Sequence, residues 1–321
     1  MISIALVGCG EHSEGSHAAP LARYAAERPG SVSLAAACDL RLPRALEFCE
    51  RFGFARAYAD VDELLSKEAV DACVTVMPVE RIAEVGARLL RRGVPCVIEK
   101  PLGASLAEVE GLARVAEETG TPHMVSVNRR FIPYLNRAAR FVGEQGGARY
   151  VRATMARHAR DESDFISTTA IHAVDALRHL AGEAADFRVK VLGDERSPAR
   201  WFVISLDFEG GAAGQVEILP TAGVVEETYE LFGEGARAQV VCASGSQRLL
   251  RCWRGGRLEV DETAEDVPED VRNGGYGEVA EFVRALAAGE RPRPTIADVL
   301  PSARICFAVA NSLAESSSQS S

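Results

Sequence analysis

The sequence lacks the features that mark secreted, membrane-spanning or zinc-binding chains. Its 8 cysteines include no C-x-x-C pair, and no histidine stands near them at the spacing of metal ligands. The common zinc motifs are therefore excluded, and the thiols are expected to be reduced and buried. No apolar run is long enough to span a bilayer, and the first residues contain no basic leader or cleavage site. We therefore expect a cytoplasmic protein without a metal centre.

The sequence also has fewer basic than acidic residues. Acidic residues outnumber basic ones by 46 to 36, which gives a formal net charge of −10. This balance offers no electrostatic support for binding nucleic acid or an anionic membrane surface, so small-molecule partners are favoured. The 321 residues are 47% hydrophobic, enough for a large core. A chain of this length indicates two domains or one large one.

The first third of the chain alternates short apolar runs with segments of helical period. The runs are ISIALV (2–7), SLAAAC (33–38), DACVTV (71–76), PCVIE (95–99) and HMVSV (123–127). Their hydrophobicity is continuous rather than alternating, which is typical of parallel strands covered by helices on both faces. The pattern predicts an α/β domain with a Rossmann-type doubly wound parallel sheet, which binds a dinucleotide and occupies residues 1–127.

From about Gly147 the pattern changes to longer runs in which apolar and polar residues alternate. These runs are 148–158, 199–209, 212–219, 226–234, 236–243 and 247–254, with helical segments at 169–182, 274–288 and 296–314. They predict an α+β domain over residues 128–313 with a large, mainly antiparallel open sheet. We expect this domain to bind substrate and join subunits, and residues 314–321 to be a disordered tail.

A glycine-rich turn follows the first apolar run directly. Gly8 and Gly10 stand where backbone N–H groups of a strand–helix turn approach a pyrophosphate, and Ser13 takes the place of the third small residue of the fingerprint. Asp39 ends the second run, where a carboxylate accepts hydrogen bonds from the ribose hydroxyls of NAD. Arg41 leaves NADP open, because a guanidinium can pair with its 2′-phosphate.

The run at 95–99 ends in charge, with Glu99 followed by Lys100 and Pro101. Ligands of open parallel sheets bind outside the carboxyl ends of the strands. A lysine at this end is placed to stabilise the oxygen of a carbonyl that is being reduced. An exposed lysine at a strand–loop junction is an equally ordinary interpretation of the same residue.

Several motifs together resemble the Gfo/Idh/MocA family, which includes glucose-fructose oxidoreductase and inositol dehydrogenase. The motifs are VGCG (7–10), CD (38–39), EKPLG (99–103), NRRFIP (128–133), HAVDALRHLAG (172–182) and YGEVAEFVRAL (276–286). The resemblance covers nearly the full chain. It implies a nicotinamide-dependent oxidoreductase that transfers a hydride between NAD(P) and a secondary alcohol of a sugar, polyol or sugar derivative. It also implies a homodimer or homotetramer.

The same resemblance implies roles for individual residues. The residues implied to contact the cofactor are Gly8, Gly10, Glu11, His12, Ser13, Asp39, Arg41, Met77, Pro78, Glu99 and Lys100. Lys100 would also reach the substrate hydroxyl and steady the developing oxyanion. His172 would be the acid–base partner, because histidine titrates near working pH.

One position departs from the family pattern. Many members carry an aspartate one helical turn before the histidine, whereas this chain has Thr168, which supplies no negative charge to raise the basicity of His172. Asp161, Glu162 and Asp164 are candidates to replace that carboxylate, or else form a solvated acidic loop. Two other functions therefore stay open: an NAD-cycling glycosidase, and an NAD(P)-binding sensor with weak chemistry.

Overall fold

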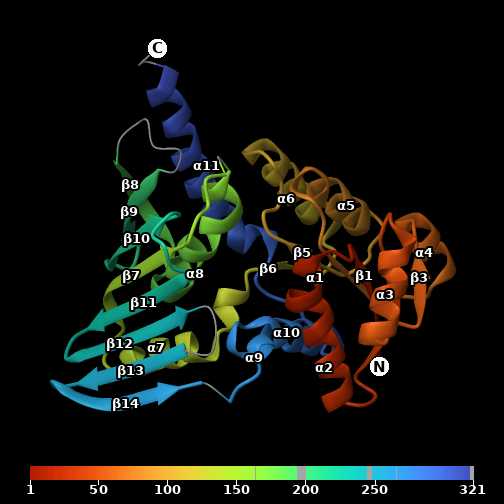
Figure 1. The fold of residues 1–321 in the computed structure, drawn as a ribbon, viewed down its shortest axis with the longest axis horizontal. Coiled ribbons are helices and arrows are strands. Elements are labelled where there is room, and N and C mark those ends of the chain that lie inside the picture. The colour runs from red at the N-terminus through yellow and green to blue at the C-terminus, as the bar shows by residue number, and fades with distance from the viewer. Residues whose placement is uncertain (163, 194–199, 244–247, 265, 319–321) are drawn as a thin grey trace. The chain divides into compact units, whose positions relative to one another are not determined.

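The computed structural model describes residues 1–162, 164–193, 200–243, 248–264 and 266–318, and the chain divides into two compact units (Figure 1). Unit 1 contains residues 1–128 together with 273–300. Unit 2 contains residues 129–272 and the chain from Pro301 onward.

Unit 1 is built on a six-stranded sheet in the order β3-β2-β1-β4-β5-β6, in which every pair of neighbours is parallel. Its strands are β1 (Ile2–Val7), β2 (Val32–Cys38), β3 (Arg56–Tyr58), β4 (Ala72–Thr75), β5 (Cys96–Glu99) and β6 (His123–Ser126). Ile4, Leu6 and Ile98 are fully buried, as strands with both faces covered require. The strand order reverses between β1 and β4, the place where ligands of such sheets bind. The predicted doubly wound sheet is confirmed.

Helices connect these strands, and α10 (Gly275–Ala287) joins the unit from a later part of the chain. The connecting helices are α1 (Glu11–Ser13), the π-helix η1 (Glu14–Ala18), α2 (Ala19–Glu27), α3 (Leu42–Phe52), α4 (Val61–Lys67), α5 (Val79–Arg91) and α6 (Leu106–Thr119). Two begin at side-chain caps that satisfy a free N–H of the first turn. Asp60 accepts from the N–H of Glu63 at 2.9 Å before α4, and Ser105 accepts from that of Glu108 at 3.3 Å before α6.

Residues 273–300 belong to unit 1, although the sequence pattern placed them in the second domain. In α10, Phe282 is buried, and the ring of Tyr276 packs against that of Tyr24 in α2 with 5.7 Å between centroids. The Tyr276 hydroxyl donates to Glu27 at 2.7 Å. This return of the chain depends on contacts between residues about 250 positions apart, which the periodicity of a single segment does not encode.

Unit 2 is built on an eight-stranded sheet in the order β14-β13-β12-β11-β7-β10-β9-β8 (Figure 1). Its strands are β7 (Ala148–Ala156), β8 (Ala184–Leu192), β9 (Trp201–Phe208), β10 (Ala213–Leu219), β11 (Glu226–Gly233), β12 (Ala236–Ala243), β13 (Arg248–Arg254) and β14 (Arg257–Thr263). Only the β7–β10 pair among these strands is parallel. The predicted mainly antiparallel sheet is confirmed.

The two edge strands, β8 and β14, were not predicted. Their residues are half-buried or exposed along the whole length. In β8 the apolar Phe187, Val189 and Val191 alternate with charged residues, so the strand pattern was present in the sequence and was overlooked. Residues 199 and 247, which begin two predicted strands, lie outside the described residues. In β9 the predicted alternation holds, because Phe202 and Ile204 are buried whereas Trp201 and Val203 are half-buried.

Helical elements also belong to unit 2, and two of them, α7 (Pro133–Gly143) and α8 (Ile171–Ala181), pack on this sheet. The others are η2 (Asn128–Phe131, whose first residue belongs to unit 1), the π-helix η3 (Ile166–Ala170), α9 (Glu269–Arg272) and the greater part of α11 (Ile296–Ser318). Of the tail expected to be disordered, residues 314–318 are helical and 319–321 lie outside the described residues. Within the described chain, none of the helices is both long enough and apolar enough to cross a bilayer.

Candidate functional site

Two glycines shape the turn after β1. Gly8 has a φ of +96°, and a Cβ built on it would lie 1.8 Å from the carbonyl oxygen of Val76, so the position requires glycine. The Gly8 N–H donates to the Cys38 carbonyl at 2.8 Å, which ties the turn to the end of β2. Around Gly10 there is no atom within 4 Å of the place of a Cβ. The missing Gly10 side chain therefore keeps open the space in front of the turn.

Backbone N–H groups hold the carboxylate of Asp39 from two sides. Its Oδ2 accepts from the N–H of Cys9 at 2.9 Å, and its Oδ1 accepts from that of Arg41 at 2.9 Å. Each oxygen keeps further acceptor capacity, because a carboxylate has about four lone-pair sites. Two hydroxyl groups on adjacent carbons, as in a ribose, fit such an acceptor pair.

The carboxyl ends of the strands in unit 1 border a cavity of about 520 Å³. All the residues that the resemblance implied for cofactor binding line it: Gly8, Gly10, Glu11, His12, Ser13, Asp39, Arg41, Met77, Pro78, Glu99 and Lys100. Its volume lies in the range of small-molecule sites. The structure thus brings these residues together, whereas their contacts with a dinucleotide stay a prediction. Arg44 also lines the cavity and was not singled out, since one arginine at the start of a helix gives no sequence signal.

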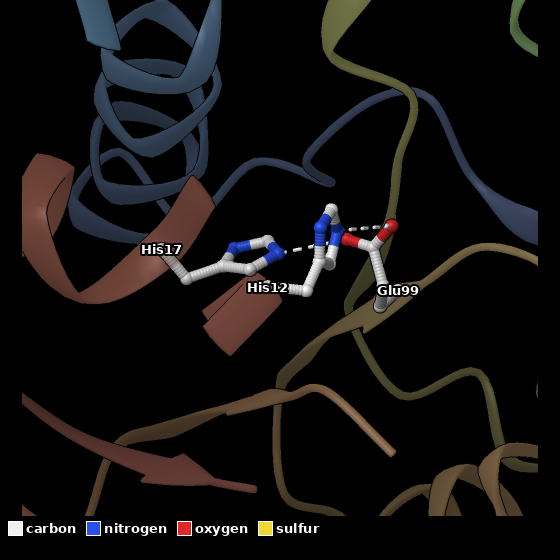
Figure 2. A group of neighbouring side chains, drawn as sticks. All are labelled: His12, His17 and Glu99. Atoms are coloured by element: carbon white, nitrogen blue, oxygen red, sulfur yellow. Dashed lines mark hydrogen bonds and ion pairs between the residues drawn. The ribbon is translucent and has the colours of Figure 1, made fainter. Parts of the chain in front are cut away.

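Glu99 ends β5 as a buried carboxylate that two histidines contact (Figure 2). His17 Nε2 lies 2.7 Å from its Oε2, and His12 Nε2 lies 3.3 Å from its Oε1. The Lys100 ammonium lies 4.0 Å from the same Oε1. Burial opposes ionisation of Glu99, but the hydrogen bonds from His12 and His17 and the nearby charges outweigh it and hold its pKa well below its usual value. Glu99 is therefore an anion.

The π-helix η1 explains how two histidines of one segment reach the same carboxylate. Its residues Glu14–Ala18 follow α1 directly and precede α2. In a π-helix the repeating hydrogen bond joins residues five apart, so such residues lie about one turn apart. His12 in α1 and His17 in η1 are five residues apart, and both rings reach Glu99. The cluster could not be predicted from local sequence patterns, because Glu99 stands 82 positions after His17.

A second carboxyl group, Glu278 of α10, is buried near Glu99 in unit 1 and is 3% exposed. Burial raises its pKa well above the usual value, and the negative charge of Glu99 raises it further, against a hydrogen bond from Ser126. At a pH at which Glu99 is ionised, Glu278 is therefore protonated and neutral. This pair was not predicted, since Glu278 lies in a segment assigned to the other domain.

We expect Glu278→Gln to make the protein more stable than the wild type at pH 8. A raised folded-state pKa contributes stability that is fully present below the ordinary value of 4.5 and is lost as pH rises through the raised pKa. Glutamine mimics the neutral acid and does not ionise, so the variant should lack this decline in the free energy of unfolding. Urea unfolding at pH 5 and pH 8 measures it, with Glu281→Gln, a half-buried member of the same helix, as control. Parallel pH profiles for wild type and Glu278→Gln would contradict the assignment.

In unit 2, His172 of α8 is buried and belongs to a charged cluster centred on Glu227. Glu227 accepts two hydrogen bonds from Arg129, at 2.6 and 3.0 Å, and one from Arg157 at 2.5 Å. The Tyr229 hydroxyl donates to it at 2.8 Å. Burial opposes ionisation, but the charges of Arg129, Arg157 and His172 hold the pKa of Glu227 well below its usual value. The buried carboxylate whose charge acts on His172 is thus Glu227, which the sequence did not indicate.

The acidic residues upstream of Thr168 do not share this burial. Asp161, Glu162 and Asp164 are exposed, and Glu162 accepts from Arg160 at 2.6 Å. The Thr168 hydroxyl donates to the backbone carbonyl of Asp164 at 2.9 Å. The solvated-loop interpretation of the three acids therefore fits better than replacement of the family carboxylate.

Glu227→Gln is expected to lower the free energy of unfolding at pH 7 by about 3–5 kcal/mol, because it leaves buried arginines without their counter-charge. The depressed pKa of Glu227 means that its contribution is present above the ordinary value of 4.5 and is lost as pH falls through the lowered pKa. The loss relative to wild type should therefore shrink in acid. Chemical unfolding from pH 3 to 7 measures it. Glu234→Gln, in an exposed ion pair with Arg149, should change stability by less than about 1 kcal/mol, and an equal effect of both substitutions would refute the prediction.

Comparison with known proteins gives consistent matches. Residues 2–128 match the sequence model of the oxidoreductase family GFO_IDH_MocA, described as having an NAD-binding Rossmann fold. D-apiose dehydrogenase from Rhizobium rhizogenes is 26% identical over 80% of this chain and 74% of that protein. UDP-N-acetylglucosamine 3-dehydrogenase from Acidithiobacillus ferrooxidans is 27% identical over 90% and 91% of the two chains. An Agrobacterium radiobacter oxidoreductase, solved with NAD⁺, L-tartaric acid and magnesium, superposes with a TM-score of 0.80 at 19% identity over 98% and 96% of the two chains.

Proposed function

Because the chain belongs to the Gfo/Idh/MocA family of oxidoreductases, we propose that it transfers a hydride between NAD and a secondary alcohol of a sugar, polyol or sugar derivative. The observation that carries this proposal is that the glycine turn, Asp39 and Lys100 line one and the same cavity in unit 1. The dehydrogenases of D-apiose and of UDP-N-acetylglucosamine among its relatives support a sugar-like substrate.

The residues of the cavity fit a dinucleotide. Gly8 and Gly10 place no side chain in front of the turn, and the backbone N–H groups at the start of α1 are suited to a pyrophosphate. Asp39 has acceptor capacity for both ribose hydroxyls, and its charge disfavours the 2′-phosphate of NADP. Arg41 and Arg44 on the same wall keep NADP as the second choice.

In the proposed mechanism a bound nicotinamide would supply the acceptor or donor of the hydride, and the glycine turn and Asp39 would hold its dinucleotide. Lys100 is proposed to stabilise the negative charge that develops on the substrate oxygen. Glu99 Oε1 lies 4.0 Å from the Lys100 ammonium. His172, buried in α8 beside the cluster of Glu227, is proposed to take and return the hydroxyl proton.

Replacing Asp39 with asparagine is expected to weaken NAD⁺ binding about 10–100-fold and to narrow the preference for NAD⁺ over NADP⁺. The substitution removes an ionised acceptor for the ribose and the repulsion of a 2′-phosphate, each worth roughly 1–3 kcal/mol. Calorimetric titration of both nucleotides measures the change. Asp60→Asn is the matched control, because Asp60 lines the same cavity and asparagine caps α4 equally well. Unaltered NAD⁺ affinity in Asp39→Asn would refute the placement of the ribose.

Incubation with NAD⁺ and a panel of sugars, polyols and their derivatives tests the activity itself. We expect reduced nicotinamide to accumulate with at least one member of the panel. Release of an aglycone without net reduction would favour the NAD-cycling glycosidase. Tight nucleotide binding with no reaction on any substrate would favour the sensor, for which Thr168 in place of the family aspartate is the motivating observation.

The proposal also includes the cellular compartment and the oligomeric state of the protein. The structure has all eight cysteines as free thiols, which is typical of a reducing compartment and supports the cytoplasm. Trp201 and Val203 give the outer face of β9 a partly apolar surface in the single chain. Such a surface supports a homodimer or homotetramer, which the molar mass in solution would test.

A further inference from the structure

His12, His17 and Glu99 form a cluster whose geometry exceeds what a hydrogen-bonded ion pair requires (Figure 2). One ligand atom from each side chain, an imidazole nitrogen from each histidine and a carboxylate oxygen, can be chosen so that all three lie within 4.8 Å of one another. A single histidine would suffice to hold a buried carboxylate. Here two imidazole rings converge on one carboxylate, with one ring nitrogen directed at each oxygen.

The donor set matches the preferences of transition-metal ions. Imidazole nitrogen suits Zn²⁺, Co²⁺ and Ni²⁺, and two histidines with one carboxylate are a common way of leaving coordination positions open. Bonds of about 2.0–2.1 Å in a tetrahedral site place neighbouring ligand atoms about 3.3 Å apart. His12 Nε2 lies 3.3 Å from Glu99 Oε1, which is this value, and His17 Nε2 lies 2.7 Å from the other oxygen, Oε2. With one ligand atom from each residue, all three atoms lie within 4.8 Å of one another, so a shift of the rings or the carboxylate would bring them to metal-binding distances.

Two of the three side chains are buried and the third is exposed, so the cluster is both held in place and open to solvent. The side chains of His17 and Glu99 are only 3% and 6% exposed, so they are held in place by their surroundings. The side chain of His12 is 56% exposed and lines the cavity of unit 1. An ion therefore has a route to the cluster, and water or another ligand can complete its coordination from the cavity.

The surroundings of the cluster add a further oxygen ligand of the same class. Glu278, a second carboxyl group buried near Glu99 in unit 1, has an Oε2 with no hydrogen-bond partner within the described residues. The Lys100 ammonium lies 4.0 Å from Glu99 Oε1, beyond hydrogen-bond distance, and opposes a cation at this place.

We propose that His12, His17 and Glu99 bind a divalent transition-metal ion of the Zn²⁺, Co²⁺ and Ni²⁺ class at the wall of this cavity. The sequence excluded a metal centre because its cysteines and histidines lack the usual spacing, but this site joins residues 82 positions apart. The proposal does not depend on the proposed dehydrogenase activity. It concerns the protein without nucleotide, since His12 and Glu99 also line the dinucleotide cavity.

Titration of the tag-free, nucleotide-free protein with Co²⁺ and Zn²⁺ tests the site. Calorimetry gives the stoichiometry and affinity, and the visible absorption of bound Co²⁺ reports its coordination. We expect one ion per chain and at least a tenfold loss of affinity in His12→Gln, because removing a direct ligand costs no less than removing a supporting one. His12 is largely exposed, so this variant should fold like the wild type. His158→Gln, an exposed histidine of unit 2, is the control and should bind as the wild type does.

A second variant tests the electrostatic part of the inference. Lys100→Met removes the positive charge beside Glu99 and should raise the affinity for Zn²⁺ several-fold. No saturable ion uptake by the wild type, or equal uptake by wild type and His12→Gln, would overturn the proposal. Failure of the dehydrogenase proposal looks different, because a protein that binds the ion but neither binds nor reduces NAD⁺ refutes only the latter.

Discussion

Replacing Gly8 with alanine is expected to lower the free energy of unfolding by about 2–5 kcal/mol and to abolish NAD⁺ binding. The new methyl group would lie 1.8 Å from the Val76 carbonyl oxygen, and the φ of +96° is strained for any side chain. Backbone strain and overpacking each cost roughly 1–3 kcal/mol. The turn can relieve the clash only by moving away from β4, which also moves the N–H groups proposed to bind the pyrophosphate.

Gly10→Ala provides the matched control for this substitution. Its φ of −89° is acceptable for alanine, and no atom lies within 4 Å of the new Cβ. We expect its thermal unfolding to resemble the wild type, while NAD⁺ binding weakens because the methyl group projects into the space in front of the turn. Thermal unfolding and calorimetry on both variants separate the two effects. A Gly8→Ala protein that melts and binds NAD⁺ like the wild type would contradict the structure of the turn.

Lys100→Ala is expected to reduce kcat by a factor of roughly 10²–10⁴, the range for losing a proton-transfer or oxyanion-stabilising group. The lysine follows β5 at the wall of the cavity, next to the buried anion Glu99. Its charge would act on the substrate oxygen more strongly in the transition state than in the bound substrate. The NAD⁺ dissociation constant should therefore change by only a few-fold while turnover collapses.

The measurement for Lys100→Ala is steady-state kinetics with the substrate that the wild type turns over best, alongside NAD⁺ titration. Lys67→Ala is the control, because Lys67 is an exposed lysine of the same unit that pairs with Glu63. It should leave both quantities unchanged. A Lys100→Ala protein that retains the wild-type kcat would remove this lysine from the mechanism, whatever its effect on KM.

The predictable parts of the fold are the elements whose pattern of apolar and polar residues lies within one short segment of the sequence. Continuous apolar runs such as 2–7 and 71–76 gave the parallel sheet, and the alternation of Phe202 and Ile204 with Trp201 and Val203 gave a strand of the antiparallel one. Asp39 was predictable as a site residue because the end of the second strand is a fixed place in this fold. These features depend on residues close together in the chain.

The parts that were missed depend on contacts between distant segments. Glu227 carries no motif, and its importance comes from Arg129, about a hundred positions earlier, and from Arg157. Glu278 lies in a helix that returns to the first unit, which no periodicity within that helix reveals. The meeting of His12 and His17 at Glu99 needs a π-helical turn, and the sequence pattern gave only the beginning of a helix.

Titration of the purified, nucleotide-free protein with NAD⁺ and NADP⁺ tests the central claim most directly, namely that the cavity of unit 1 binds a nicotinamide dinucleotide through Asp39. We expect one NAD⁺ per chain, bound more tightly than NADP⁺, with that preference reduced in Asp39→Asn and kept in Asp60→Asn. A wild-type protein that binds neither nucleotide, or an Asp39→Asn variant that binds both as the wild type does, would contradict the claim.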